Sequence, residues 1–140
     1  MTDGLSQVRL YAMRLVYLLI AIGLGSGAWS TIIDPGANLN RLDGVAYSFW
    51  AAFSALALLG VRFPIQMLPL LLLQLFYKLI WFTAVAYPLW SSGELNPMTD
   101  RMVRIFGLAV FFDLIVIPWP WVFKHYIASI FSAKAADLAA

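Results

Sequence analysis

Two charged side chains interrupt long apolar segments of this sequence, where a charge is energetically costly. Lys78 lies within the apolar run of residues 65–90, and Asp113 lies within the run of residues 102–123. At the centre of a membrane-spanning helix, such a charge costs about 2.5–3.5 kcal/mol. Because the cost falls when opposite charges meet, these positions predict an ion pair or hydrogen bond between Lys78 and Asp113.

Two further polar groups extend this cluster along the helix that carries Lys78. Gln74 precedes Lys78 by one helical turn, so its amide can donate to and accept from the same network. Trp81 follows on nearly the same stripe, and its indole N–H needs an acceptor. We therefore predict an intramembrane polar cluster of Gln74, Lys78, Trp81 and Asp113.

The cluster has two possible roles, and the sequence leaves both open. In a structural role, the ion pair fixes the register of two helices and binds no ligand. In a functional role, it lines a cavity that takes a proton, an ion or a substrate, as ionisable groups inside membranes usually do. The mutual neutralisation of Lys78 and Asp113 favours the structural role, because it leaves no vacant group for a ligand.

Other chemistries lack the residues that they need. The chain has no cysteine and one histidine, His125, so we expect no metal, haem or other cofactor. It has no Gly-x-Ser-x-Gly, His-Glu-x-x-His or phosphate-binding glycine motif, so we expect no enzyme activity. The net charge of +2 is dispersed, which argues against a nucleic-acid partner.

The composition predicts the elements that position the cluster. Of the 140 residues, 63% are hydrophobic and 11% are charged, whereas a soluble domain has about 25% charged residues. Four apolar runs are each about as long as the ~20 residues that cross a bilayer. They cover residues 15–33, 45–61, 65–90 and 102–123. We predict an all-α protein, a single transmembrane domain over residues 1–140 that forms a four-helix bundle.

Glycine and proline punctuate the helix connections. Gly60 suits the left-handed position that ends a helix, and Pro64 suits the first turn of the next one, which predicts a tight antiparallel hairpin. Asn96 before Pro97 predicts the N-cap of the fourth helix.

Small residues mark faces where helices can approach closely. Gly23 and Gly27 share a small-xxx-small spacing, as do Ala51 and Ala55. We expect these residues to pack helices within the bundle, with contact between protomers as the alternative.

The tail, residues 124–140, follows Pro118 and Pro120, which end or kink the fourth helix. Apolar residues then recur with helical spacing, with Lys124 and His125 on the opposite face. The pattern is typical of a short amphipathic helix on the membrane surface. A fourth helix that continues straight and packs on a partner is the alternative.

Basic residues predict the orientation in the membrane. Five flank the side that holds both termini: Arg9, Arg14, Arg62, Lys124 and Lys134. Three flank the other side: Arg41, Arg101 and Arg104. Both termini are therefore predicted to be cytoplasmic. The first segment also resembles a secretory signal, but three further spans follow it, so we expect it to be retained.

Several segments carry a resemblance to a known group of proteins. The segments are Leu59–Pro69, then Gln74, Lys78 and Trp81 with Pro88-Leu89-Trp90, and finally Ile117-Pro118-Trp119 with Val122 and Tyr126. Together they resemble a family of small uncharacterised four-helix inner-membrane proteins of proteobacteria. The resemblance covers helices two to four and implies a bacterial inner-membrane protein, without an activity to transfer.

These observations predict a non-catalytic integral membrane protein. It would act as an accessory or assembly subunit of a membrane complex, or bind a lipid-like ligand. The alternative is a small dimeric proton- or ion-coupled transporter that uses Lys78, Asp113 and Gln74. An enzyme acting on a lipid or quinone ranks last. The expected partners are the lipid bilayer and either another membrane protein or a second copy of the chain.

Overall fold

The computed structural model describes residues 4–34 and 36–132, and within these ranges every regular element is a helix. The prediction of an all-α protein is confirmed. The helices run in the order α1 (Gln7–Leu19), η1 (Ile20–Leu24), α2 (Gly25–Ile33), α3 (Arg41–Arg62), α4 (Leu68–Trp81), η2 (Phe82–Ala86), α5 (Tyr87–Ser91), α6 (Pro97–Val116), α7 (Trp119–Val122) and η3 (Phe123–Ile127). The η elements are π-helical turns within longer helices.

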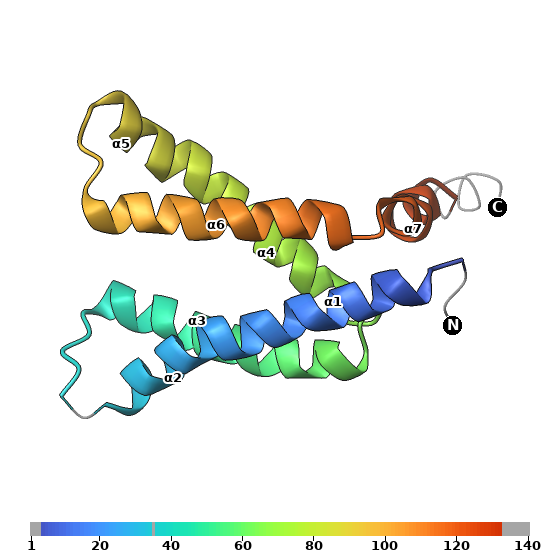
Figure 1. The fold of residues 1–140 in the computed structure, drawn as a ribbon, viewed down its shortest axis with the longest axis horizontal. Coiled ribbons are helices and arrows are strands. Elements are labelled where there is room, and N and C mark those ends of the chain that lie inside the picture. Colours follow the sequence, from blue (N-terminus) through green and yellow to red (C-terminus); the bar gives the residue numbers. More distant parts are fainter. Residues whose placement is uncertain (1–3, 35, 133–140) are drawn as a thin grey trace.

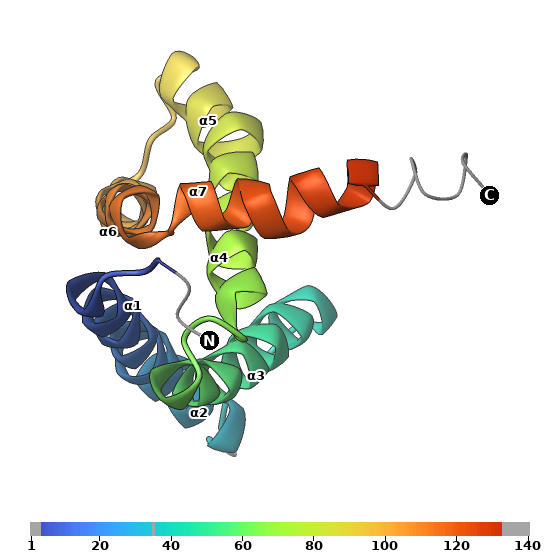
Figure 2. The same ribbon diagram turned by 90° about the vertical axis from the view of Figure 1, so that its right-hand side faces the viewer.

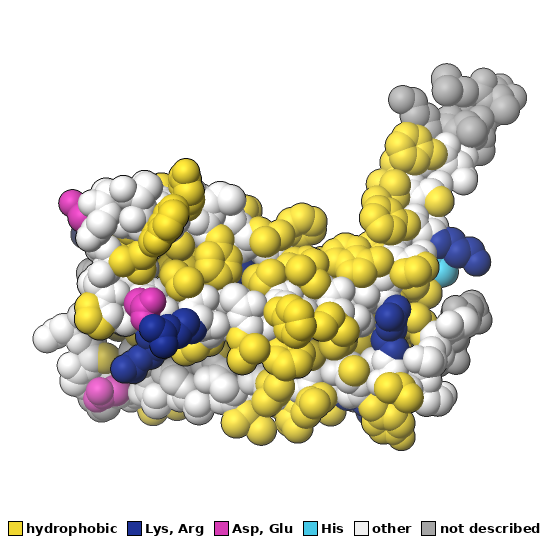
Figure 3. Space-filling model, turned by 45° about the horizontal axis from the view of Figure 1, so that its top comes forward, with side chains coloured by type: hydrophobic (Ala, Val, Ile, Leu, Met, Phe, Trp, Pro, Cys, Tyr) yellow, Lys and Arg dark blue, Asp and Glu magenta, His cyan; other side chains and the backbone are white. Residues whose placement is uncertain are grey.

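Three of these helices are long and apolar enough to cross a membrane: Gln7–Ile33, Arg41–Arg62 and Leu68–Ser91. A fourth span is possible if Pro97–Val116 and the bent helix after it count as one. The face drawn in Figure 3 carries hydrophobic side chains along its middle and charged side chains toward its two ends.

The helices form two pairs that diverge from each other: the first helix with α3, and α4 with α6. The first helix lies beside α3, whereas α6 packs on both α1 and α4 (Figure 1). Seen along the long axis, α4 and α5 form a column that rises away from α3 (Figure 2). The first helix runs antiparallel to α3, and the helix of α4 and α5 runs antiparallel to α6 (Figure 1). The predicted tight hairpin of α3 and α4 is not observed, since these two helices make few contacts with each other.

Side-chain caps explain where the helices begin. The Asn96 side chain accepts a hydrogen bond from the backbone N–H of Thr99 at 2.8 Å, which confirms the predicted cap before Pro97. The Asn40 side chain caps α3 in the same way, through the N–H of Asp43 at 2.9 Å.

The predicted role of Gly60 is wrong. Gly60 lies inside α3, and a Cβ there would clash with the ring of Tyr17. The Tyr17 hydroxyl donates to the carbonyl of Pro64 at 3.0 Å, in the turn between α3 and α4. Pro64 lies before α4, which begins at Leu68 and has Pro69, rather than Pro64, in its first turn. Gly60 makes room for a tyrosine that holds this turn against α1.

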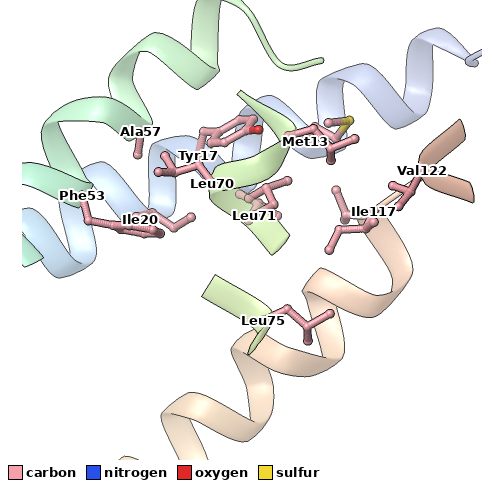
Figure 4. Packing of buried hydrophobic residues seen from close by; sticks show 13 residues of the cluster. Met13, Tyr17, Ile20, Phe53, Ala57, Leu70, Leu71, Leu75, Ile117 and Val122 are labelled. Atoms are coloured by element: carbon pink, nitrogen blue, oxygen red, sulfur yellow. The ribbon is translucent and has the colours of Figure 1, made fainter. Parts of the chain in front are cut away.

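The hydrophobic core lies at the end of the molecule near this turn. It joins α1, α3, α4, α6 and α7 through side chains that include Met13, Tyr17, Leu71, Leu75 and Ile117 (Figure 4). Tyr17, Met13, Leu71 and Ile117 are completely buried.

The small residues pack differently from the prediction. A Cβ at Gly23 or Gly27 would meet nothing within 4 Å, and Ala55 is exposed, so only Ala51 of the predicted set is buried. Gly25 makes the close approach instead, because a Cβ there would lie 3.0 Å from the Ser54 side chain. The π-helical turn Ile20–Leu24 precedes Gly25 and rotates the face that meets α3, since a π turn holds more residues than an α turn.

The fourth apolar segment is broken. The helix α6 ends at Val116, and the helix of residues 119–132 is bent away from it by 70°. A straight fourth helix over residues 102–123 is therefore wrong, and the kink predicted at Pro118 is observed. The last helix projects away from the other helices (Figure 2) and has an exposed apolar face that includes Phe123, Ile127 and Ile130. Residues 133–140 of the predicted tail, Lys134 among them, lie outside the described residues.

Candidate functional site

A cavity of about 200 Å³ lies where the first helix, α4 and α6 meet. Its apolar walls come from the first helix and α6, and its polar groups come mainly from α4. The lining residues are Val16, Leu19, Ile20, Leu24, Gln74, Tyr77, Lys78, Phe106, Ala109, Phe112 and Asp113. Three of the four residues predicted to form a polar cluster therefore face one space.

Gln74, rather than Lys78, holds the carboxylate of Asp113. The Gln74 Nε2 donates to both Asp113 oxygens, each at 2.9 Å. Asp113 is 0% exposed and lies in the last turn of α6. The carbonyl end of a helix disfavours a negative charge, and this turn contains no basic residue. The amide of Gln74 is therefore the main donor that stabilises the buried carboxylate.

The predicted direct contact between Lys78 and Asp113 is wrong. Within the described residues the one ion pair joins Arg104 and Asp100, on the surface at 2.7 Å. The Lys78 Nζ lies instead over the rings of Tyr77 and Phe106, 5.3 and 5.6 Å from their centroids. These distances suit cation–π contacts.

The physical reason is the position at which α6 ends. The prediction placed Asp113 near the middle of a helix that extends to residue 123, at the depth of Lys78. Because α6 ends at Val116, Asp113 lies near the end of its helix and level with Gln74. Lys78 lies one turn further along α4, level with Phe106.

Lys78 consequently has no acceptor among the described residues, although most of its side chain is buried. The residue is 4% exposed, lines the cavity, and donates no hydrogen bond to any residue within 4–34 and 36–132. An ammonium group carries three donors and no acceptor. A buried group of this kind needs an oxygen from outside the described chain, or water, to complete its bonding.

Trp81 does not join the polar cluster. Its ring packs against Phe106 with centroids 5.0 Å apart, and its indole N–H donates to none of the described residues. Trp81 faces a second cavity of about 480 Å³, between α3 and the pair of α4 and α6. Tyr77 and Phe106 line both cavities, so they form the partition between them.

Tyr77 and Phe106 are the site residues that the sequence reasoning missed. Tyr77 neighbours Lys78 in sequence, and Phe106 lies two turns before Asp113 on the same face of α6. Their rings pack edge to face, with centroids 6.0 Å apart and planes at 88°. Aromatic residues are so frequent in this chain that these two carried no distinct signal.

The mouth of the cavity is apolar. Leu19 is 59% exposed and Phe112 is 45% exposed, although both line the cavity. A molecule that enters between these side chains crosses apolar surface before it reaches the polar groups. The described residues contain no group of three or more acidic or histidine side chains that would hold a metal ion.

Comparisons with family models, with curated proteins and with solved structures found no match. The resemblance to proteobacterial inner-membrane proteins stays a prediction. The geometry of the cavity therefore carries the functional argument.

Proposed function

We propose that this is a non-catalytic protein of the bacterial inner membrane that binds a lipid-like amphiphile. The polar head of the ligand lies in the cavity between the first helix, α4 and α6. Its apolar part leaves through the mouth beside Leu19 and Phe112.

One observation carries this proposal: Lys78 is only 4% exposed and lines the cavity, and its amine has no acceptor among the described residues. The structural role of Lys78 rested on direct neutralisation by Asp113, and that contact is not made. A ligand oxygen at Lys78 supplies the missing acceptor, and hydrogen bonds to charged donors are stronger than neutral ones.

The shape of the cavity supports a ligand from the lipid phase. Its volume of about 200 Å³ is smaller than the ~300–1,000 Å³ of sites that enclose a whole drug-sized molecule. It suits a head group, while the attached chain extends over exposed apolar surface.

The proposed arrangement in the membrane has four crossing segments, with both termini in the cytoplasm. The start of α1, the turn between α3 and α4, and α7 lie at one end of the long axis (Figure 1). The basic residues Arg9, Arg14, Arg62 and Lys124 belong to these segments. The bent helix of residues 119–132 lies on the cytoplasmic surface, with Phe123 and Ile127 toward the acyl chains.

The test compares co-purified amphiphiles in the wild type and two lysine variants. The protein is released from native membranes in detergent, and its bound molecules are weighed by native mass spectrometry. Lys78→Met should lose the bound species, whereas Lys124→Met, which removes an exposed lysine, should retain it. Equal retention by both variants would contradict the proposal, provided that both have the thermal stability of the wild type.

The second candidate is proton- or ion-coupled transport by a dimer. The observation that favours it is that Lys78 and Asp113 share one cavity without touching, so a proton or ion can lie between them. Proteoliposomes containing a pH-sensitive dye separate the candidates. A transporter would collapse an imposed proton gradient in a manner that Asp113→Asn abolishes, whereas a binding protein would not.

A further inference from the structure

This inference rests on the proposed function and defines the class of ligand. We infer that the head of the bound amphiphile is a neutral carbonyl group on a flat ring, as in a quinone, rather than an anionic group.

The charge of the cavity argues for a neutral head. Of its lining residues, Lys78 carries a positive charge and Asp113 a negative one, and no other lining residue is charged. The two charges sum to zero before a ligand enters. A carboxylate or phosphate head would leave a net negative charge in a medium of low polarity, which is costly, whereas a neutral head preserves the balance.

The hydrogen-bonding groups of the cavity without a partner among the described residues are two donors and one acceptor, the Gln74 Oε1. The Asp113 oxygens already accept from Gln74. The Lys78 amine and the Tyr77 hydroxyl make no hydrogen bond within the described part of the chain, and both residues line the cavity. The donors of Lys78 and Tyr77 match an acceptor, and a carbonyl oxygen accepts through two lone pairs.

The aromatic partition argues for a ring. Tyr77 and Phe106 separate the polar cavity from the second cavity, in which Trp81 packs on Phe106. Planar rings pack favourably against such side chains. The second cavity, of about 480 Å³, is the larger of the two and adjoins the first at Tyr77 and Phe106. A ring whose carbonyl reaches Lys78 therefore has the aromatic side chains of Tyr77 and Phe106 beside it.

The experiment measures the binding of three probes to the protein in lipid nanodiscs, with empty nanodiscs as the blank. The probes share a ten-carbon chain: a decyl-substituted benzoquinone, methyl decanoate and decanoate. The first is a neutral ring ketone, the second a neutral carbonyl without a ring, and the third an anion.

The quinone should bind most tightly. Lys78→Met should weaken its binding about tenfold or more, since hydrogen bonds to charged groups have that magnitude. Phe106→Leu should weaken it about threefold, and Phe106→Tyr, which keeps a ring, should weaken it less. Trp90→Leu is the control, because Trp90 is exposed and lines neither cavity.

Two results would overturn the inference while leaving the proposed function intact. Tightest binding of decanoate, strengthened further by Asp113→Asn, would show that the head is anionic. Equal binding of the ester and the quinone, unaffected by Phe106→Leu, would show that the ring is not recognised. If no probe depends on Lys78, the proposed function itself fails.

Discussion

The two sides of the first helix pack in contrasting ways. Toward α3, small residues bring the backbones together, with Gly25 against Ser54 and Gly60 beneath the Tyr17 ring. Toward α4 and α6, the same helix borders a cavity that contains an unpaired lysine. The first interface is closely packed, and the Trp29 and Ser54 side chains are hydrogen-bonded across it. The second contains a cavity and a donor without an acceptor. Both features lower the stability of the fold, and such features are expected at binding sites rather than at structural interfaces.

The most damaging substitution should be Gly60→Leu, at the filled interface. The new side chain would occupy the space of the Tyr17 ring. We expect a loss of about 3 kcal/mol or more in the free energy of unfolding, seen as a large fall in thermal stability in detergent. The control is Gly27→Leu, because a Cβ at Gly27 meets nothing within 4 Å. Similar losses for both variants would show that the Tyr17 contact is unimportant.

The next effect should come from Gln74→Leu, at the floor of the cavity. It removes the donors that hold the Asp113 carboxylate, so the free energy of unfolding should fall by about 2–3 kcal/mol. Adding Asp113→Leu should restore most of the loss, because the buried charge is then absent. A double variant that is as unstable as the sum of the single ones would contradict this assignment.

A smaller loss is expected at the filled interface from Trp29→Phe. The Trp29 indole donates to the Ser54 hydroxyl at 3.1 Å, and loss of that bond should cost about 1 kcal/mol. Chemical denaturation can measure this difference against Trp90→Phe, an exposed tryptophan that donates to none of the described residues.

The smallest effect on stability should be that of Lys78→Met. Because Lys78 is mostly buried and its amine has no acceptor among the described residues, its removal should leave the thermal midpoint unchanged or raise it. A loss comparable to that of Gln74→Leu would reveal an ion pair with Asp113, and the two sides of the first helix would then be alike.

The sequence predicted the helices but not their faces. Apolar runs place the first three long helices within a few residues, apart from the start of the first one at Gln7. The face of a helix that packs on its neighbour depends on irregular turns, and the periodicity of apolar residues does not reveal such turns. The π-helical turn before Gly25 moves the contact away from Gly23 and Gly27.

Three of the four predicted members of the candidate site were correct, and the predicted contact between Lys78 and Asp113 was wrong. Gln74, Lys78 and Asp113 do share a cavity, because charges in apolar helices are rarely placed toward lipid. Which of these side chains contact each other depends on their positions along the axes of α4 and α6. Ile117-Pro118 ends α6 early and brings Asp113 level with Gln74, a shift that the apolar run does not show, since it continues past the break.

The most direct test of the account is an experimental density map of the protein in lipid nanodiscs, with amphiphiles from the native membrane retained. The account predicts a bound molecule in the cavity, with an oxygen within hydrogen-bonding distance of Lys78 Nζ and the Gln74–Asp113 contact preserved. A cavity filled by side chains, with Lys78 bonded directly to Asp113, would contradict it.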